Sequence, residues 1–448
     1  MVLFAAVTVE AAEPMFRGQP VSYWAESYCS NTNPAARQVL EQMGPALAVP
    51  ALTKLIDQPD VEANEAYRTA YPAIKLSAGG VQAPLWKSTL AASALTSFGP
   101  DAEPAVPELI RIFPNRSDQH KSEIARVFSH VGPAASSSVA VLGQALSTTN
   151  GELKKEILWA FGHIGPAANS VQPLISNELN NADMFVRLNA AFAIWTVAHE
   201  TNAALQVFLV ALNDSNPYVL GTAINYLTRI GPVAGPAVPQ LLKAIQHDHV
   251  PVQWEAVRAL GWIGDNSPEV ISALAAVLKS EPKDYNEVVL QELSASALGR
   301  LGPGAREAVP ALIATVKRGR VSASAQESPY DLMSEALRAL GKIGPNAQAA
   351  LPLAQSLLKD VQVRVRLAAA EAVWGIDGGR TVQAQEVLID WKPNLKSLIN
   401  QAERFSQQRH SLMVKIRDQE LLMGALAKAD PDLYSKALKA TNQLVSRK

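Results

Sequence analysis

The chain has 448 residues, 48% hydrophobic and 18% charged, which is long enough for one large repeat array or for about two to three globular domains. Its 40 Lys and Arg residues balance 41 Asp and Glu residues, which gives a net charge of -1. The overall electrostatic field of such a protein would not steer it onto nucleic acid or an acidic membrane. The single cysteine, Cys29, excludes an internal disulfide framework and a multi-cysteine zinc site.

Residues 1–13 have features of an export signal. Val2 to Val9 form a short apolar stretch, and Ala11 and Ala12 offer small residues where a signal peptidase could cut, although no basic residue precedes the stretch. No uncharged apolar run in the chain reaches the roughly 20 residues that span a bilayer, so we expect no transmembrane segment. We expect export to the periplasm or cell surface, and the alternative is a cytoplasmic protein with a frayed N-terminus.

From residue 34 onward, a Gly-Pro dipeptide recurs along the chain. The copies at residues 99, 132 and 165 are 33 residues apart, and each follows an apolar pattern with large residues three and four positions apart. That pattern predicts a helix with one buried face. The copies are Gly44-Pro45, Gly99-Pro100, Gly132-Pro133, Gly165-Pro166, Gly231-Pro232, Gly302-Pro303 and Gly344-Pro345, with Ala198-His199 and Gly264-Asp265 as degenerate copies.

A second proline follows eight residues after the glycine in five copies. These prolines are Pro107, Pro173, Pro239, Pro310 and Pro352. Proline suits the first turn of a helix, whereas glycine suits the end of one. Each repeat is therefore predicted to be two antiparallel helices, and neither can bury its apolar face without the neighbouring repeat.

The combined pattern resembles HEAT repeats of the short kind found in phycobilisome lyases. It consists of Ala-Val-Pro-x-Leu, a turn containing Asp, a Val-Arg pair and Leu-Gly-x-Ile-Gly-Pro, and it covers residues 34–380. The resemblance implies an all-α, right-handed α-solenoid of about 9–10 stacked helical hairpins with terminal caps. Residues 14–33 are expected to form the N-terminal cap, because Phe16 to Trp24 resemble the segment that precedes such arrays in exported bacterial proteins.

In this family the turn Asp and the Val-Arg pair tend to bridge adjacent repeats. The resemblance assigns that role to Asp183 with Val186-Arg187, and to Asp360 with Val363-Arg364.

Three departures from the period predict insertions. The longest covers residues 57–88, and shorter ones lie around residues 281–287 and 317–330. Insertions in repeat proteins often project from a binding face, and the alternative is tolerated loop lengthening. After Arg380 the repeat pattern fades into helical segments at residues 383–389, 393–426 and 431–445, so residues 381–448 are predicted to form a C-terminal helical cap.

The chain lacks the common catalytic motifs. No serine-hydrolase elbow, phosphate-binding loop, dinucleotide fingerprint or HExxH zinc motif occurs in it. His247-Asp248-His249 could ligate a metal with a third residue, but its position in a turn favours an exposed loop. His199-Glu200 resembles the His-Glu pairs of the HEAT-like deoxyhypusine hydroxylases, but a single pair lacks the other ligands of a di-iron site. We expect no cofactor, no metal and no catalytic residue.

One column of the repeat, the x of Leu-Gly-x-Ile-Gly-Pro, is polar to basic. Stacked repeats should align this column as a row near the C-terminal ends of the second helices. In order, the column holds Ser97, His130, His163, Thr196, Arg229, Trp262, Arg300 and Lys342. The candidate partner-binding row consists of His130, His163, Arg229, Trp262, Arg300 and Lys342.

The row has two interpretations. Arg and Trp are typical interface anchors, so the row, with Trp195 and Trp374 nearby, predicts a strip that binds an anionic peptide. The alternative is that cations in this column only complement the helix dipole. Trp195 and Trp374 replace the glycine of Leu-Gly and are expected to pack between helices.

These patterns predict a monomeric, non-catalytic scaffold that binds a protein or peptide partner on the concave surface of the solenoid, and no nucleic acid. The alternative is a cofactor-dependent lyase or hydroxylase-like HEAT enzyme, or a subunit of one. Such an enzyme would purify with colour or with stoichiometric metal, whereas a scaffold would not.

Overall fold

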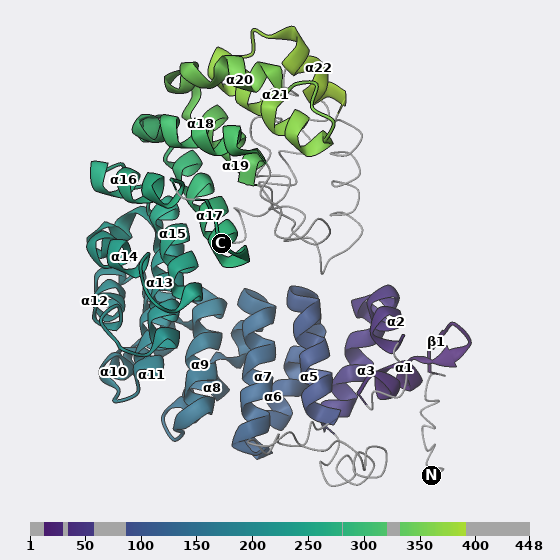
Figure 1. Cartoon of the computed structure of the whole chain (residues 1–448). Helices are drawn as coiled ribbons and strands as arrows, with labels where there is room; N and C mark the ends of the chain where they lie inside the picture. The colour runs from purple at the N-terminus through teal and green to yellow at the C-terminus, as the bar shows by residue number, and fades with distance from the viewer. Residues whose placement is uncertain (1–12, 30–34, 58–86, 280, 320–331, 391–448) are drawn as a thin grey trace, which may run out of the picture. The chain divides into compact units, whose positions relative to one another are not determined.

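The computed structural model describes residues 13–29, 35–57, 87–279, 281–319 and 332–390 (Figure 1). In these residues the regular structure consists of helices and two strands of two residues each, so the predicted all-α solenoid is confirmed. The chain divides into two compact units, residues 1–204 and 205–448, and each is described by itself.

Several predicted segments lie outside the described residues. They are the export signal up to residue 12, the interior of the longest insertion at 58–86, the third insertion from residue 320, and the C-terminal segment from residue 391 with its predicted helices at 393–426 and 431–445. The ends of the longest predicted insertion are helical, because Asp57 closes helix α3 (Pro45–Asp57) and Lys87 opens helix α5 (Lys87–Phe98).

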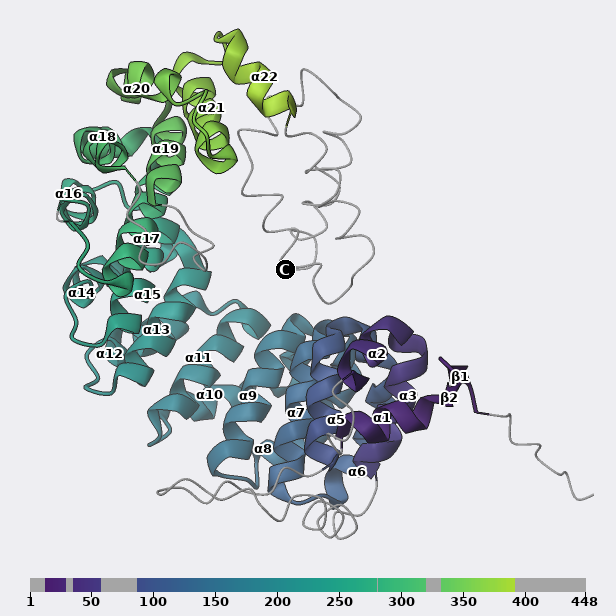
Figure 2. The same ribbon diagram turned by 45° about the vertical axis from the view of Figure 1, so that its right-hand side comes forward.

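The first unit stacks helical hairpins, each made of a first helix and a second helix. The second helices lie side by side in chain order, and the first helices form another layer (Figures 1 and 2). The hairpins are α3 with α5, α6 with α7, α8 with α9, and α10 with α11. The elements not yet given are β1 (Met15–Phe16), β2 (Gln19–Pro20), α1 (Val21–Cys29), α2 (Ala36–Met43), α6 (Val106–Ile112), α7 (Asp118–Val131), α8 (Val139–Leu146), α9 (Gly151–Ile164), α10 (Gln172–Asn177) and α11 (Met184–Ala198).

A small β-hairpin precedes these helices. Met15 pairs with Pro20 and Phe16 with Gln19 in antiparallel register, and Arg17 and Gly18 form the turn with φ of 49° and 76°. The indole Nε1 of Trp24 in α1 donates to the carbonyl of Phe16 at 2.9 Å, which ties the hairpin to the helix. Helix α1 in turn contacts α2, α3 and α5, so the segment predicted as a cap lies against the N-terminal helices of the unit.

The second unit repeats the same hairpin. The pairs are α12 with α13, α14 with α15, α16 with α17, α18 with α19, and α20 with α21. Within the first of these pairs, the rings of Phe208 and Tyr226 lie 5.3 Å apart and join α12 to α13. The helices are α12 (Thr201–Ala211), α13 (Pro217–Ile230), α14 (Val238–Ala244), α15 (Val250–Ile263), α16 (Pro268–Val277), α17 (Tyr285–Leu301), α18 (Val309–Arg318), α19 (Leu332–Ile343), α20 (Leu351–Ser356), α21 (Val363–Asp377) and α22 (Val382–Asp390). Helix α22 corresponds to the helix predicted at residues 383–389.

The Gly-Pro dipeptide ends one helix and begins a 3₁₀ helix that the sequence pattern did not predict. Gly132 closes α7 with φ of 71°, and Gly165 closes α9 with φ of 72°, a backbone region that residues with a Cβ rarely adopt. Where the second proline is present, the α-helix that follows the 3₁₀ helix begins one residue before it, as at Val106 before Pro107. The 3₁₀ helices after a Gly-Pro dipeptide are Gly99–Ala105, Gly132–Ser138, Gly165–Val171, Gly231–Ala237, Gly302–Ala308 and Gly344–Ala350; two shorter ones, Phe113–Asn115 and Glu178–Asn180, follow α6 and α10.

The degenerate copies end their helices differently. His199 closes α11 in the left-handed region with φ of 57°, and Gly264 closes α15 with φ of 75°. In the described residues no 3₁₀ helix follows either of them. The division between the two units falls a few residues after His199.

The glycine of Leu-Gly permits successive second helices to approach closely. A Cβ added at Gly261 would lie 2.8 Å from the Cα of Ala297, and one added at Gly299 would lie 3.0 Å from the Cα of Ala339. At Gly341 the added atom would lie 2.8 Å from the carbonyl oxygen of Glu371. Backbone therefore packs against backbone or small side chains at these crossings, which a larger residue would push apart.

The turn Asp and the Arg of the Val-Arg pair act mainly within their own repeat, so the predicted bridge between repeats is wrong for Arg187. The carboxylate of Asp183 caps α11 by accepting from the backbone N–H of Phe185 at 2.8 Å. Arg187 donates to the carbonyl of Ala182 at 3.0 Å, in the same turn. Across the repeat, the charge of Asp183 contributes to raising the pKa of Lys155.

The prediction that Val363-Arg364 is the Val-Arg pair of the turn at Asp360 is also wrong. Val363 is 49% exposed and Arg364 is exposed, whereas Val365 is buried. Arg366, four residues after the N-cap Gln362, donates to the carbonyl of Asp360 at 2.6 Å and so takes the part of Arg187. Two Val-Arg dipeptides follow each other in this segment, and only the helix start decides which one faces the turn.

We expect Gly375→Ala to lower the free energy of unfolding by about 1–3 kcal/mol, because the added Cβ would overlap the carbonyl of Gly341 where α19 and α21 cross. Gly221→Ala is the matched control, since Gly221 lies inside the second helix α13 and an added Cβ there meets nothing within 4 Å. The control should raise stability by about 0.5–1 kcal/mol. Urea unfolding followed by circular dichroism measures both, and equal effects would contradict the packing role.

Candidate functional site

Within each unit, the row of x residues lies on neighbouring second helices, one repeat apart. In the first unit, a Cβ added at Gly132 would lie 3.6 Å from the carbonyl oxygen of His163, and one at Gly99 would lie 3.8 Å from that of His130. In the second unit, an added Cβ at Gly302 would lie 3.8 Å from the carbonyl oxygen of Lys342. The end of each of these helices therefore touches the row residue of the next repeat.

The two histidines of the row are held by their own helices. His130 is exposed and His163 is half-buried. The Nδ1 atom of His130 lies 2.8 Å from the carbonyl oxygen of Arg126, and that of His163 lies 3.0 Å from the carbonyl oxygen of Trp159. Because a carbonyl can only accept, both Nδ1 atoms carry a proton, and any further proton goes to Nε2.

An aromatic cluster surrounds His163 on α9 and α11. Its ring centroid lies 4.2 Å from that of Trp159 and 5.2 Å from that of Phe192, and Phe192 lies 6.1 Å from Trp195. Phe192 packs over Gly162, where an added Cβ would overlap its ring. Phe192, rather than Trp195, therefore joins the two helices.

Trp195 and Trp374, which were expected to pack between helices, have contacts within or just after their own helices. Both are half-buried. The ring contact of Trp195 is with Phe192 of its own helix, and the ring of Trp374 lies against Gly379, just after its own helix. Phe192 lies on the side of α11 that faces α9, because its ring fills the space over Gly162.

In the second unit the row contains a stacked cation. The guanidinium carbon of Arg300 on α17 lies 3.9 Å from the ring centroid of Trp262 on α15. Arg300 is exposed and Trp262 is half-buried. Arg229, one repeat earlier, is also exposed, and partial burial of its guanidinium lowers its pKa. Lys342 on α19 continues the row one repeat later and lies close to Gly299 of α17.

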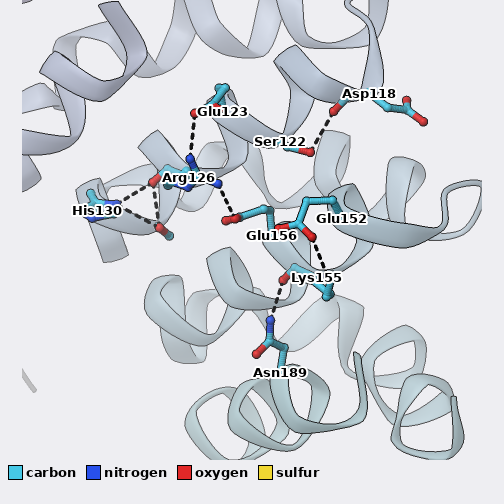
Figure 3. Close-up of polar contacts among 10 residues, drawn as sticks. Asp118, Ser122, Glu123, Arg126, His130, Glu152, Lys155, Glu156 and Asn189 are labelled. Carbon is cyan, nitrogen blue, oxygen red and sulfur yellow. Dashed lines mark hydrogen bonds and ion pairs between the residues drawn. The ribbon is translucent and has the colours of Figure 1, made fainter. Parts of the chain in front are cut away.

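An ion pair and a hydrogen bond join neighbouring second helices, at positions nearer their N-termini than the row (Figure 3). Arg126 on α7 binds Glu123 of its own helix at 2.9 Å and Glu156 of α9 at 2.7 Å. Asn189 on α11 donates from its side chain to the carbonyl of Lys155 on α9 at 3.0 Å. These contacts link three successive repeats, and the sequence analysis missed them.

The same arrangement recurs between α19 and α21. Arg338 binds Glu335 of its own helix at 2.6 Å and Glu371 of α21 at 3.0 Å. The side chain of Glu371 is 4% exposed, and its burial raises its pKa although the charge of Arg338 opposes this. A Glu-x-x-Arg pattern at residues 123–126, 255–258 and 335–338 is the sequence signal that could have indicated the contact.

The His247-Asp248-His249 triplet forms a turn. The Nδ1 atom of His247 accepts from the backbone N–H of His249 at 2.9 Å, and His249 is the N-cap residue of α15. Asp214 and Asp360 accept from the residue two positions later in the same way, both at 2.8 Å. His247 therefore replaces the aspartate of this turn.

His199 and Glu200 also have structural contacts. His199 adopts the left-handed conformation at the end of α11, and the carboxylate of Glu200 accepts from the side chain of Gln172 at 2.7 Å. In the part of the chain that the structure describes, no three His, Cys, Asp or Glu residues lie together as a metal site would require. The described helices also include none that is long and apolar enough to cross a membrane.

Comparison with known proteins identifies the repeat in the second unit. Residues 205–294 match the family model described as HEAT repeats. Among solved structures the chain is similar to an engineered protein, with 22% identity, a TM-score of 0.41, and coverage of 80% of this chain and 94% of that chain. It is also similar to the complex of CpcE and CpcF of phycocyanin lyase from Nostoc sp. PCC7120, with 19% identity, a TM-score of 0.32, and coverage of 61% of this chain and 94% of that chain. No curated protein matches the chain.

We expect Arg338→Met to lower the free energy of unfolding by about 3 kcal/mol, because it leaves the buried carboxylate of Glu371 without its cation. Adding Glu371→Leu to this variant should restore most of the loss, since both buried charges are then gone. Denaturant unfolding of the two single variants and the double variant measures the coupling. Additive single effects would show that the pair does not join the helices.

The buried Glu371 should also make stability depend on pH. Its pKa is raised in the folded state, so its contribution is present below the unfolded value of about 4.3 and is lost as pH rises through the folded value. The stability of Glu371→Gln relative to wild type should therefore increase from pH 4 to pH 7. The exposed Glu307→Gln serves as control in the same urea titrations, and a pH-independent difference for Glu371→Gln would contradict the prediction.

Proposed function

We propose that this HEAT-repeat protein is a non-catalytic scaffold that binds a protein partner through the row, which consists of His130 and His163 in the first unit and of Arg229, Trp262, Arg300 and Lys342 in the second. The proposal follows from the chemistry of the row and from the described residues, which contain no cluster of His, Cys and carboxylates that could hold a metal. The partner segment that the row fits is acidic, because the row carries cations and titratable histidines and no carboxylate.

The contact between Arg300 and Trp262 is the observation that carries the proposal. A guanidinium stacked 3.9 Å above an indole keeps its N–H groups directed outward in the plane of the group, where they can donate to a carboxylate. Arg and Trp together form the anchors that dominate many protein interfaces. The stack joins side chains from two different repeats, so the fold presents it as a preformed surface.

The helix dipole alone does not explain the whole row. It favours a cation at the end of any helix, and Lys243 and Lys317 in the last turns of α14 and α18 are examples on the first helices. It gives no reason for an arginine of one repeat to stack on a tryptophan of another. The mid-helix cations Arg126 and Arg338 differ again, because each binds glutamates of its own and the next helix.

We expect the double variant Arg229→Glu, Arg300→Glu to lose a partner that wild type retains in pull-downs from the source organism, because the charge of the row is reversed at two of its repeats. The matched control is Lys243→Glu, Lys317→Glu, which makes the same charge change in the last turns of first helices. Mass spectrometry of the captured proteins compares the three baits after circular dichroism has shown equal helicity.

Two results would count against the scaffold. If the row variant captures the same proteins as wild type, the row is only a feature of helix ends. If the purified chain carries colour or stoichiometric metal, the alternative of a cofactor-dependent lyase or hydroxylase-like enzyme, or a subunit of one, takes its place.

A further inference from the structure

Exposed aromatic residues gather at the opposite ends of the second helices in the second unit. Tyr218 at the start of α13 is 70% exposed, and Tyr285 at the start of α17 is 46% exposed. Trp254 in the first turns of α15, between them, is half-buried. Tyr and Trp are typical anchors of interfaces, so exposed rings at the same place in repeats of one stack favour a binding surface.

Contacts between repeats make these residues one surface, which we call the aromatic patch (Tyr218, His249, Trp254 and Tyr285). The ring of Tyr218 lies edge-on to that of His249, with centroids 6.0 Å apart. The indole Nε1 of Trp254 donates to the carbonyl of Asn286 on α17 at 3.3 Å. Helices α13, α15 and α17 are consecutive neighbours (Figures 1 and 2), so the patch spans three repeats.

The rings are not needed to start the helices. Asn216 caps α13 by accepting from the backbone N–H of Tyr218 at 3.0 Å, and Asp284 caps α17 by accepting from the N–H of Glu287 at 2.9 Å. The turn before α15 is closed by His247. The caps use backbone N–H groups, so the rings of Tyr218 and Tyr285 take no part in starting the helices.

The loops around the patch are acidic. The loops before the second helices and the first turns of these helices contain five carboxylates and two ammonium groups. None of the five carboxylates forms an ion pair within the described residues. The carboxylates are Asp214, Asp248, Glu281, Asp284 and Glu287, and the ammonium groups are Lys279 and Lys283. Those of Asp214 and Glu287 accept from backbone N–H groups instead, both at 2.8 Å.

Helix dipoles do not reverse this charge. The N-termini of the second helices each carry about half a positive charge, but the C-termini of the first helices lie at the same end of the hairpins and carry the opposite sign. The last turns of the first helices also carry cations, Lys243 on α14 and Lys317 and Arg318 on α18, and Arg318 donates to the carbonyl of Leu278 at 2.6 Å. The carboxylates adjoin the patch residues in the chain, as Asp248 adjoins His249 and Asp284 adjoins Tyr285.

We propose that the aromatic patch is a second binding surface, independent of the row, and that it takes a lysine- or arginine-containing segment of a protein partner. The cationic groups of such a segment lie over the exposed faces of Tyr218 and Tyr285 while the loop carboxylates pair with them. The two ends of the second helices then have opposite preferences, the row for acidic segments and the patch for basic ones.

A fluorescently labelled hexa-arginine peptide tests the proposal by anisotropy with the full chain. Tyr218→Ala, Tyr285→Ala should weaken its binding about 10-fold, from the loss of two cation–π contacts. Tyr218→Phe, Tyr285→Phe keeps both rings and should bind as wild type does. Asp248→Asn, Glu281→Gln removes two carboxylates that make no hydrogen bond and should also weaken binding.

The outcomes separate clearly. Equal binding by wild type and the alanine variant overturns the patch as the site, and loss of binding by the phenylalanine variant overturns the role of the ring faces. Tighter binding of a hexa-glutamate peptide, lost in the alanine variant, would overturn the charge preference. If the alanine variant does not fold, the phenylalanine and carboxylate variants still decide, because unchanged binding by Asp248→Asn, Glu281→Gln overturns the proposal.

Discussion

Close contact between successive second helices is the constraint on which the rest of this structure depends. A single hairpin of the repeat cannot bury its apolar faces, so its stability comes from the neighbouring repeat. The glycine of Leu-Gly permits that contact, with backbone atoms meeting at Gly341 and the ring of Phe192 filling the space over Gly162. Because the glycine lies next to the x position, the same contact brings the x residues of neighbouring repeats into register.

A second helix such as α7 has three zones with different chemistry. Its N-terminal end lies beside the loops, where caps and turns use Asp, Asn and His. Its middle carries glutamate and arginine pairs such as Arg126 with Glu156, which connect one repeat to the next. Its C-terminal end carries the row, where Arg300 stacks on Trp262. A repeat protein can thus separate stabilising charges from charges that face a partner.

The buried pair of Arg338 and Glu371 shows how the middle zone works. Removing a guanidinium or carboxylate from water is costly, and the pair offsets that cost only when both partners are present. The pair lies next to the close backbone approach of α19 and α21 at Gly341, and the side chain of Glu371 is buried there while that of Arg338 is partly exposed. The buried carboxylate therefore favours the alignment of the two repeats in which Arg338 reaches it.

The sequence by itself determined the class of fold and the position of the row. Glycine followed by proline ends a helix for local reasons of backbone conformation, and a fixed interval implies stacking, so the helix ends and the column of x residues could be read from the order of residues. It also placed Trp262 and Arg300 one repeat apart. It could not show that they stack, because that depends on the crossing of α15 and α17.

Only the tertiary structure decided which residues meet across repeats. The sequence offered two Val-Arg dipeptides near Asp360, and the start of α21 selected Arg366 over Arg364. Glu371 reaches Arg338, and Tyr218 reaches His249, across 33 and 31 residues. Such contacts depend on the rotation and spacing of packed helices, whereas the sequence pattern reports only which face of each helix is buried.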